Sequence, residues 1–117
     1  MKVKDILGKS VIYASVPGTR DEILELMRKH GVNVVPVVKK GTMVLAGIVT
    51  HKELMEKPSE TQIALLMKRD PETVSAEDDI EELIRLILEK NIFHVPVTDE
   101  GRNLVGVVSL SDIVRKV

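Results

Sequence analysis

Two short stretches of the sequence carry a hydroxyl and a carboxylate three residues apart. In GIVTHKEL these are Thr50 and Glu53, and in GVVSLSDI they are Ser109 and Asp112. A hydroxyl where a strand gives way to a helix, followed three residues later by an acid, is typical of a capping box. The same groups also suit a ligand, because an ionised carboxylate accepts hydrogen bonds from the adjacent hydroxyls of a ribose.

The helix that follows each hydroxyl adds to this chemistry, since its first amides lack intrahelical partners and attract phosphate. For Asp112 the binding role is favoured over capping. For Glu53 both roles stay open, because a side chain one methylene longer cannot place its carboxylate at the same point. His51 lies between Thr50 and Glu53, where it can either assist in binding phosphate or lie in solvent. The residues expected to contact ribose and phosphate are Ser109, Ser111, Asp112, Thr50, Lys52 and Glu53.

The two stretches belong to a repeat of about sixty residues that spans the whole chain. Pro36 aligns with Pro96 and Leu26 with Leu86, and one extra residue near Val44 then shifts the alignment so that the two stretches match. The amino end takes part as well. There, Val3, Ile6 and Leu7 correspond to Ile63, Leu66 and Met67. We therefore expect two repeats, over residues 1–58 and 59–117.

Each repeat predicts the order β-α-β-β-α. A short strand (VIYASV, ETVSA) precedes a helix with apolar residues at helical spacing, which ends at Gly31 or Asn91 in the left-handed conformation. A buried hairpin follows (VNVVPVV with MVLAGIV, IFHVPVT with NLVGVV), and then a last helix (HKELMEK, LSDIVRKV). The fold class is α+β. Each repeat leaves one sheet face bare, so we expect the two sheets to pack on each other about a pseudo-twofold axis.

Capping boxes are predicted at the helix starts. They are Thr19 with Glu22, then Asp79 with Glu82 or Asp78 with Glu81, and Ser59 with Gln62 for a linking helix over SETQIALLMKR.

Composition excludes several classes of function. The net charge of −1 offers no field for DNA or an anionic membrane, and no apolar run approaches a bilayer span. There is no cysteine, and His30, His51 and His94 lie too far apart in the repeat for a zinc site. No nucleophile–base pair is visible, so we do not expect an enzyme. We expect a cytoplasmic protein, and heavy use of Glu and Lys favours a heat-adapted source.

The aliphatic-Pro-Val strands (VVPVV, HVPVT) and the doubled Gly-x-x-Thr/Ser-x-x-acid turns resemble a CBS-domain pair, or Bateman module, over essentially the whole chain. The resemblance implies a regulatory module that binds an adenosine-containing ligand (AMP, ADP, ATP or S-adenosylmethionine) in two clefts between the repeats. It implies a homodimer. We expect no cofactor, and no metal because the chain has no cysteine and its histidines lack the spacing of a zinc site. The resemblance also implies that Asp112 contacts the ribose.

The same resemblance implies where the base lies. One cleft would combine Asp112 and Ser109 with Ile12, Tyr13, Val32, Asn33, Val34 and Pro36; the other would combine Glu53 and Thr50 with Thr73, Ile92, Phe93, His94 and Pro96. Tyr13 either stacks on adenine or fills the space expected to hold the adenine base. His94 either faces phosphate, as a basic residue does in some relatives, or is a satisfied half-buried side chain.

The leading hypothesis is therefore a free-standing adenosine-ligand sensor whose ligand changes the surface offered to a regulated partner. The alternative is a ligand-free scaffold for dimerisation or protein interaction, which the altered Glu53 and the bulky Tyr13 favour.

Overall fold

The computed structural model describes residues 1–8 and 10–116 and divides the chain into two compact units. One unit, Ile12–Pro71, contains Thr50 and is called the Thr50 unit. The other, Met1–Val11 with Glu72–Val117, is called the Ser109 unit. This division differs from the predicted repeats, 1–58 and 59–117, because the segment that opens each repeat packs in the unit that holds the sheet of the other repeat.

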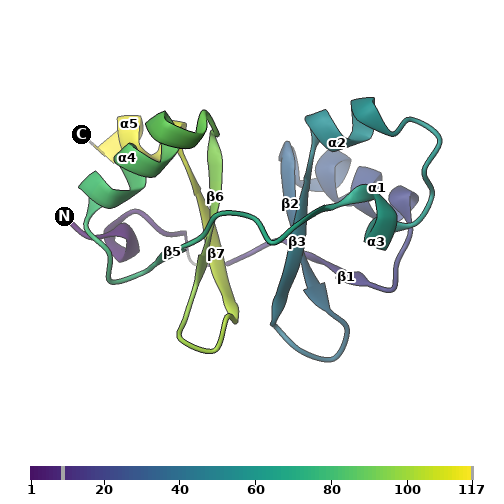
Figure 1. Ribbon diagram of the computed structural model, residues 1–117, viewed down its shortest axis with the longest axis horizontal. Coiled ribbons are helices and arrows are strands. Elements are labelled where there is room, and N and C mark those ends of the chain that lie inside the picture. Colours follow the sequence, from purple (N-terminus) through teal and green to yellow (C-terminus); the bar gives the residue numbers. More distant parts are fainter. Residues whose placement is uncertain (9, 117) are drawn as a thin grey trace. The chain divides into compact units, whose positions relative to one another are not determined.

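The Thr50 unit is a four-stranded sheet with its helices on one side (Figure 1). The strand order is β1-β2-β3-β4, with β1 parallel to β2 and the remaining pairs antiparallel. The elements are β1 (Ala14–Val16), α1 (Arg20–His30), β2 (Val34–Lys39), β3 (Leu45–Thr50), α2 (His51–Glu56), α3 (Ile63–Leu66) and β4 (Lys68–Arg69).

The Ser109 unit repeats this plan with three strands in the order β5-β6-β7. Its first pair is again parallel and its second antiparallel. The predicted order β-α-β-β-α is thus confirmed in both repeats, and the α+β class with it. The elements are the 3-10 helix η1 (Val3–Asp5), β5 (Val74–Ser75), α4 (Ile80–Lys90), β6 (His94–Thr98), β7 (Leu104–Ser109) and α5 (Leu110–Lys116).

The ends of the two long helices confirm the predicted left-handed caps. Gly31 closes α1 with φ 64° and Asn91 closes α4 with φ 52°. Glycine and asparagine are the residues that adopt this conformation at least cost.

The starts of these helices are where predicted, but the side-chain boxes are wrong. Thr19 and Asp79 are the N-cap residues, yet neither side chain makes a capping hydrogen bond. The amides that the capping side chains were expected to bind, those of Glu22 and Glu82, donate instead to the backbone carbonyls of Thr19 and Asp79, at 3.1 Å and 3.0 Å. The first helical amides bond to the opening segments: that of Arg20 donates to the Thr61 carbonyl at 2.7 Å, and that of Ile80 donates to the Met1 carbonyl at 3.0 Å. Because these donors are already bonded to backbone carbonyls, they need no side-chain cap.

The predicted linking helix over residues 59–69 is also wrong in its extent. Helix α3 covers only Ile63–Leu66 and is capped at Gln62 rather than at Ser59. It stops because Lys68 and Arg69 leave the helix to pair with Ile48 and Gly47 of β3. The sheet hydrogen bonds thus replace the last turn that the sequence pattern suggests.

The opening segments complete the hydrophobic core of each unit. In the Ser109 unit, Val3 and Ile6 are buried in one cluster with residues of α4, β6 and β7, and Leu7 packs against it. In the Thr50 unit, the corresponding Ile63, Leu66 and Met67 are buried with residues of α1, β2 and β3. Burying such aliphatic side chains stabilises a protein by about 1.5–3 kcal/mol each.

The glycine that starts each doubled stretch makes room for this packing. A Cβ on Gly47 would lie 2.5 Å from the Lys68 carbonyl oxygen and 2.8 Å from the Met67 sulfur. A Cβ on Gly106 would lie 2.8 Å from Cδ2 of Leu7. These contacts are too close for any real side chain, so both positions require glycine unless the neighbour moves.

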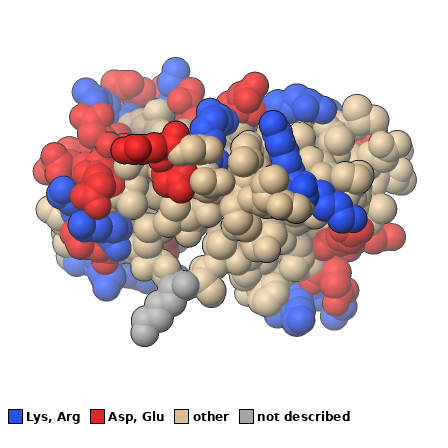
Figure 2. All heavy atoms as spheres, turned by 90° about the horizontal axis from the view of Figure 1, so that it is seen from below, with Lys and Arg blue, Asp and Glu red and all other residues tan. Residues whose placement is uncertain are grey.

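The surface carries both signs of charge. Acidic and basic side chains are interspersed on the face seen in Figure 2, in keeping with the net charge of −1. Over residues 1–8 and 10–116, no helix is both long enough and apolar enough to cross a bilayer.

The two glycines differ in what blocks them, which gives a testable order of stability. Gly47→Ala pushes against a backbone carbonyl, so we expect it to lower the free energy of unfolding by about 1–3 kcal/mol. Gly106→Ala meets the flexible end of Leu7 and should cost less. Gly8→Ala, whose nearest atom is 3.9 Å away, is the control and should lie within about 0.5 kcal/mol of wild type. Chemical denaturation measures all three, and a larger loss for Gly106→Ala than for Gly47→Ala would contradict the packing described.

Candidate functional site

The Ser109 turn joins β7 to α5 and holds two hydroxyls and a half-buried carboxylate. Oδ2 of Asp112 accepts hydrogen bonds from the Ser109 amide at 2.8 Å and the Ser109 hydroxyl at 3.1 Å. The Ser109 and Ser111 hydroxyl oxygens are 2.9 Å apart. Oδ1 of Asp112 makes no hydrogen bond within residues 1–8 and 10–116. The carboxylate thus caps the turn with one oxygen and keeps the other for a further donor.

His94 lies beside this turn, because β6 and β7 pair with His94 opposite Ser109. Burial lowers the pKa of His94, and the nearby Asp112 carboxylate only partly opposes that shift. The imidazole is therefore neutral at pH 7 and can both donate and accept a hydrogen bond. The hairpin prediction implied this pairing, but the proximity of His94 to Asp112 was not inferred from the sequence.

The amides expected to hold phosphate are already in part used within the chain. The Leu110 amide donates to the Phe93 carbonyl at 3.2 Å, and the Ser109 amide donates to Asp112. The Asp112 amide makes a long contact of 3.4 Å with the Ser109 hydroxyl. The phosphate role therefore stays a prediction with a smaller set of donors than the sequence indicated.

The Thr50 turn joins β3 to α2 and is closed more tightly. Oε1 of Glu53 accepts from the Thr50 amide at 2.6 Å and from the Thr50 hydroxyl at 2.7 Å, and the Lys52 amide donates to that hydroxyl at 3.2 Å. Glu53 is only 8% exposed. Of the two roles left open for Glu53, the capping box is the one that this geometry displays.

The residues predicted to line the base slots lie beside the turns of their own units. Val34 is paired with Thr50 across β2 and β3, as His94 is with Ser109 across β6 and β7. The predicted clefts combine a turn with the strands of the opposite repeat, and that combination stays a prediction. In the Thr50 unit, Val32, Asn33, Val34 and Pro36 lie at or just before β2, and Ile12 and Tyr13 precede β1. In the Ser109 unit, Thr73 precedes β5, and Ile92, Phe93, His94 and Pro96 lie at or just before β6.

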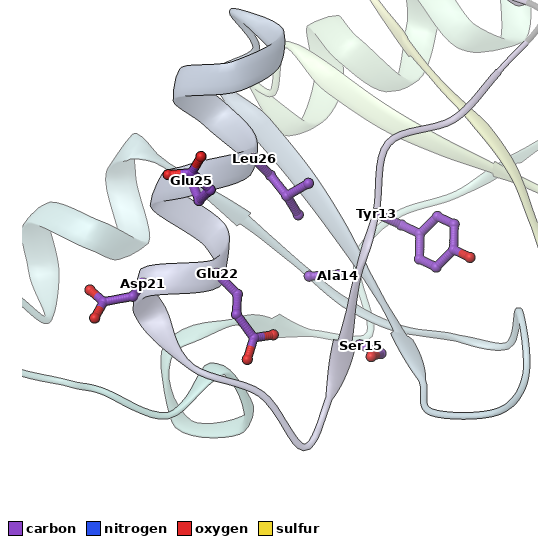
Figure 3. A pocket seen from close by; sticks show the side chains of 7 residues that line it. All are labelled: Tyr13, Ala14, Ser15, Asp21, Glu22, Glu25 and Leu26. Carbon is purple, nitrogen blue, oxygen red and sulfur yellow. The ribbon is translucent and has the colours of Figure 1, made fainter.

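A pocket of about 570 Å³ lies between β1 and α1 of the Thr50 unit (Figure 3). Its lining residues are Tyr13, Ala14, Ser15, Asp21, Glu22, Glu25 and Leu26. Of the predicted site residues only Tyr13 is among them, and Figure 3 shows its ring pointing away from α1. Because Tyr13 is 43% exposed, it does not plug the interior of its unit.

The acidic side chains of this pocket are partly engaged by neighbours. Glu25 forms an ion pair with Arg28, and Glu22 accepts a hydrogen bond from the Thr19 hydroxyl at 3.4 Å. In the part of the chain that the structure describes, no group of three or more His, Asp or Glu side chains is arranged to hold a metal ion.

Comparison with known proteins places the chain in a family. The family model for the CBS domain matches twice, over residues 3–60 and 62–117. The doubled strand–turn–helix units are thus a tandem pair of domains of one class, and the chain belongs to the CBS domain family.

Its relatives include proteins of unknown and of enzymatic function. The uncharacterized protein MJ0188 of Methanocaldococcus jannaschii is 27% identical over 98% of this chain, which spans 43% of MJ0188. An inosine-5'-monophosphate dehydrogenase of the same organism is 27% identical over 98% of this chain, which spans 23% of that enzyme. The chain therefore spans less than half the length of either relative.

Two solved structures show the same fold. The CBS domain pair of protein MJ0100, in complex with 5′-methylthioadenosine and S-adenosyl-L-methionine, is 30% identical with a TM-score of 0.91 over 99% of this chain and 94% of that one. CBSX2 in complex with AMP is 24% identical with a TM-score of 0.87 over 98% of this chain and 94% of that one.

The lowered pKa of His94 predicts a pH dependence of stability. Since the folded protein binds this proton less readily than the unfolded chain, stability is complete above a pH of about 6.5 and falls as the pH decreases through the lowered pKa. The slope for one proton is at most about 1.4 kcal/mol per pH unit. We expect His94→Gln to remove this component between about pH 5 and about pH 7, the range in which histidine titrates. His30→Gln, at an exposed helix end, is the control, and an unchanged slope in His94→Gln would contradict the assignment.

Proposed function

We propose that this CBS pair is a sensor module that binds an adenosine-containing ligand and has no catalytic role of its own. The ligand class comprises S-adenosylmethionine, 5′-methylthioadenosine, AMP, ADP and ATP. The observation that carries the proposal is the half-buried Asp112, whose second carboxylate oxygen is free within the described residues and faces no ion pair.

The chemistry of the Ser109 turn supports this proposal. A carboxylate oxygen, two hydroxyls and a neutral imidazole together accept and donate the hydrogen bonds that a ribose offers. The MJ0100 pair, at 30% identity, binds two adenosine derivatives that carry no phosphate. This agrees with a turn whose amides are largely used within the chain.

In this proposal Asp112 and Ser109 hold the sugar of the ligand, and Tyr13 contacts the base. An exposed Tyr13 ring is compatible with stacking on adenine, which stabilises such complexes by about 1–3 kcal/mol per base.

The melting temperature tests ligand binding directly. We expect at least one of the five ligands, at 100 times its dissociation constant, to stabilise the protein by about 2.7 kcal/mol and to raise the melting temperature by several degrees. Asp112→Asn keeps the shape of the side chain but weakens acceptance of ribose hydrogen bonds, so its shift should be much smaller. Glu56→Gln, on an exposed position of α2, is the matched control. Melting curves unchanged by all five ligands would refute the sensor function.

A second candidate function is a scaffold that associates with itself or with a partner protein. The observation in its favour is a set of large apolar side chains exposed on helices. Met55 of α2, Leu88 of α4 and Val114 of α5 are 79%, 74% and 66% exposed. Apolar side chains left in water on several helices are typical of association surfaces when they form a contiguous patch.

Light scattering separates this function from ligand sensing. We expect a dimer whose dissociation constant rises when Leu88→Asp puts a charge at this exposed apolar position of α4. Lys29→Asp, at an exposed helix position with no large apolar surface, is the control. A monomer at all concentrations would remove the scaffold, whereas a dimer that ignores every adenosine ligand would favour it over the sensor.

A further inference from the structure

The two turns correspond in the repeat, but they differ in how far their carboxylates are buried: Glu53 is buried and Asp112 is half-buried. We infer that each chain takes one adenosine ligand, at the Ser109 turn, and that the Thr50 turn is closed by its own Glu53. This inference rests on the proposed ligand binding and adds which turn binds and how many ligands are bound.

Glu53 is committed to its own backbone. Its Oε1 holds both the amide and the hydroxyl of Thr50, at 2.6 Å and 2.7 Å. Charge-assisted hydrogen bonds of this length are the strong ones. Oε2 of Glu53 makes no hydrogen bond within the described residues, but the side chain is only 8% exposed, which leaves a ribose little room to reach this oxygen while the capping box stays closed. Opening it would leave the Thr50 amide without its partner.

Asp112 is held more loosely and is more accessible. Its bonds to the Ser109 amide and hydroxyl are 2.8 Å and 3.1 Å, and both go to Oδ2. It is half-buried rather than buried. Oδ1 can therefore accept a ribose hydroxyl while Oδ2 keeps the turn closed, and binding does not require the cap to break.

The groups around the two turns reinforce the difference. The residue paired with Ser109 is His94, which offers a ring nitrogen, whereas the residue paired with Thr50 is Val34, which offers none. In α5 the residue after the first helical position is Ser111, whose hydroxyl lies 2.9 Å from that of Ser109. The Ser109 turn thus has three side chains besides Asp112 that hydrogen-bond a sugar.

The difference in length between the two acids gives a reciprocal test. Glu53→Asp withdraws the carboxylate by one methylene and should loosen the Thr50 turn, whereas Asp112→Glu gives the Ser109 turn the acid that closes its counterpart. Isothermal titration with S-adenosylmethionine and native mass spectrometry measure the number of ligands per chain. For wild type we expect one. Glu53→Gln should keep one ligand with an affinity within about twofold, while Asp112→Asn and Asp112→Glu should each weaken binding by about tenfold or more.

Amide chemical shifts provide a readout that does not depend on stoichiometry. On titration with S-adenosylmethionine, the amide of Ser111 should shift and that of Lys52 should not. In Glu53→Asp, the chemical shift of the Lys52 amide should also change as ligand is added. Circular dichroism verifies that each variant folds. Two ligands per wild-type chain, or a tenfold loss in Glu53→Gln, overturns the single-site inference but leaves the sensor function standing. No heat and no shifts with any adenosine ligand refutes the sensor function itself.

Discussion

Each compact unit of this protein depends on a segment that belongs, by sequence, to the other repeat. Val3 and Ile6 complete the core that α4 forms with β6 and β7, and Ile63 and Leu66 do the same beneath α1. The same segments supply the carbonyls that receive the first amides of the two long helices. Neither repeat, taken as a continuous stretch of chain, contains its whole core or all the partners of its backbone, because part of each compact unit comes from the opening segment of the other repeat.

This exchange also explains the composition of the doubled stretches. The glycine that starts each of them leaves room for the incoming segment, Met67 and Lys68 at Gly47 and Leu7 at Gly106. Three residues further along the same strand lies the hydroxyl of the turn. The strand that carries the functional turn is therefore the strand that the exchanged segment packs against, and packing of the segment helps to fix where the turn lies.

The two copies show how one motif can serve two purposes. In both, the hydroxyl residue's amide is bound by the acid three positions later, which stabilises the start of the last helix. In the first copy that bond is short and the acid is buried, so little of the carboxylate is accessible from outside. In the second copy the shorter acid leaves an oxygen and part of its surface available beside a neutral histidine. The two acids differ by one methylene, and in the structure this difference goes with a buried carboxylate at Glu53 and a half-buried one at Asp112.

The sequence by itself determined the β-α-β-β-α order, the helix ends at Gly31 and Asn91 and the two hydroxyl–acid turns, since these follow from local spacing and from the repeat. Its resemblance to a known family indicated the CBS domain pair. The sequence did not reveal that backbone carbonyls would bind the helix amides in place of the predicted side-chain caps, or that Lys68 and Arg69 would leave α3 for a strand. Only the tertiary structure decided that Glu53 is buried and that His94 lies beside Asp112. The reason is that burial and hydrogen-bond partners are set by groups brought in from distant parts of the chain, and no local pattern of residues records which of them will arrive.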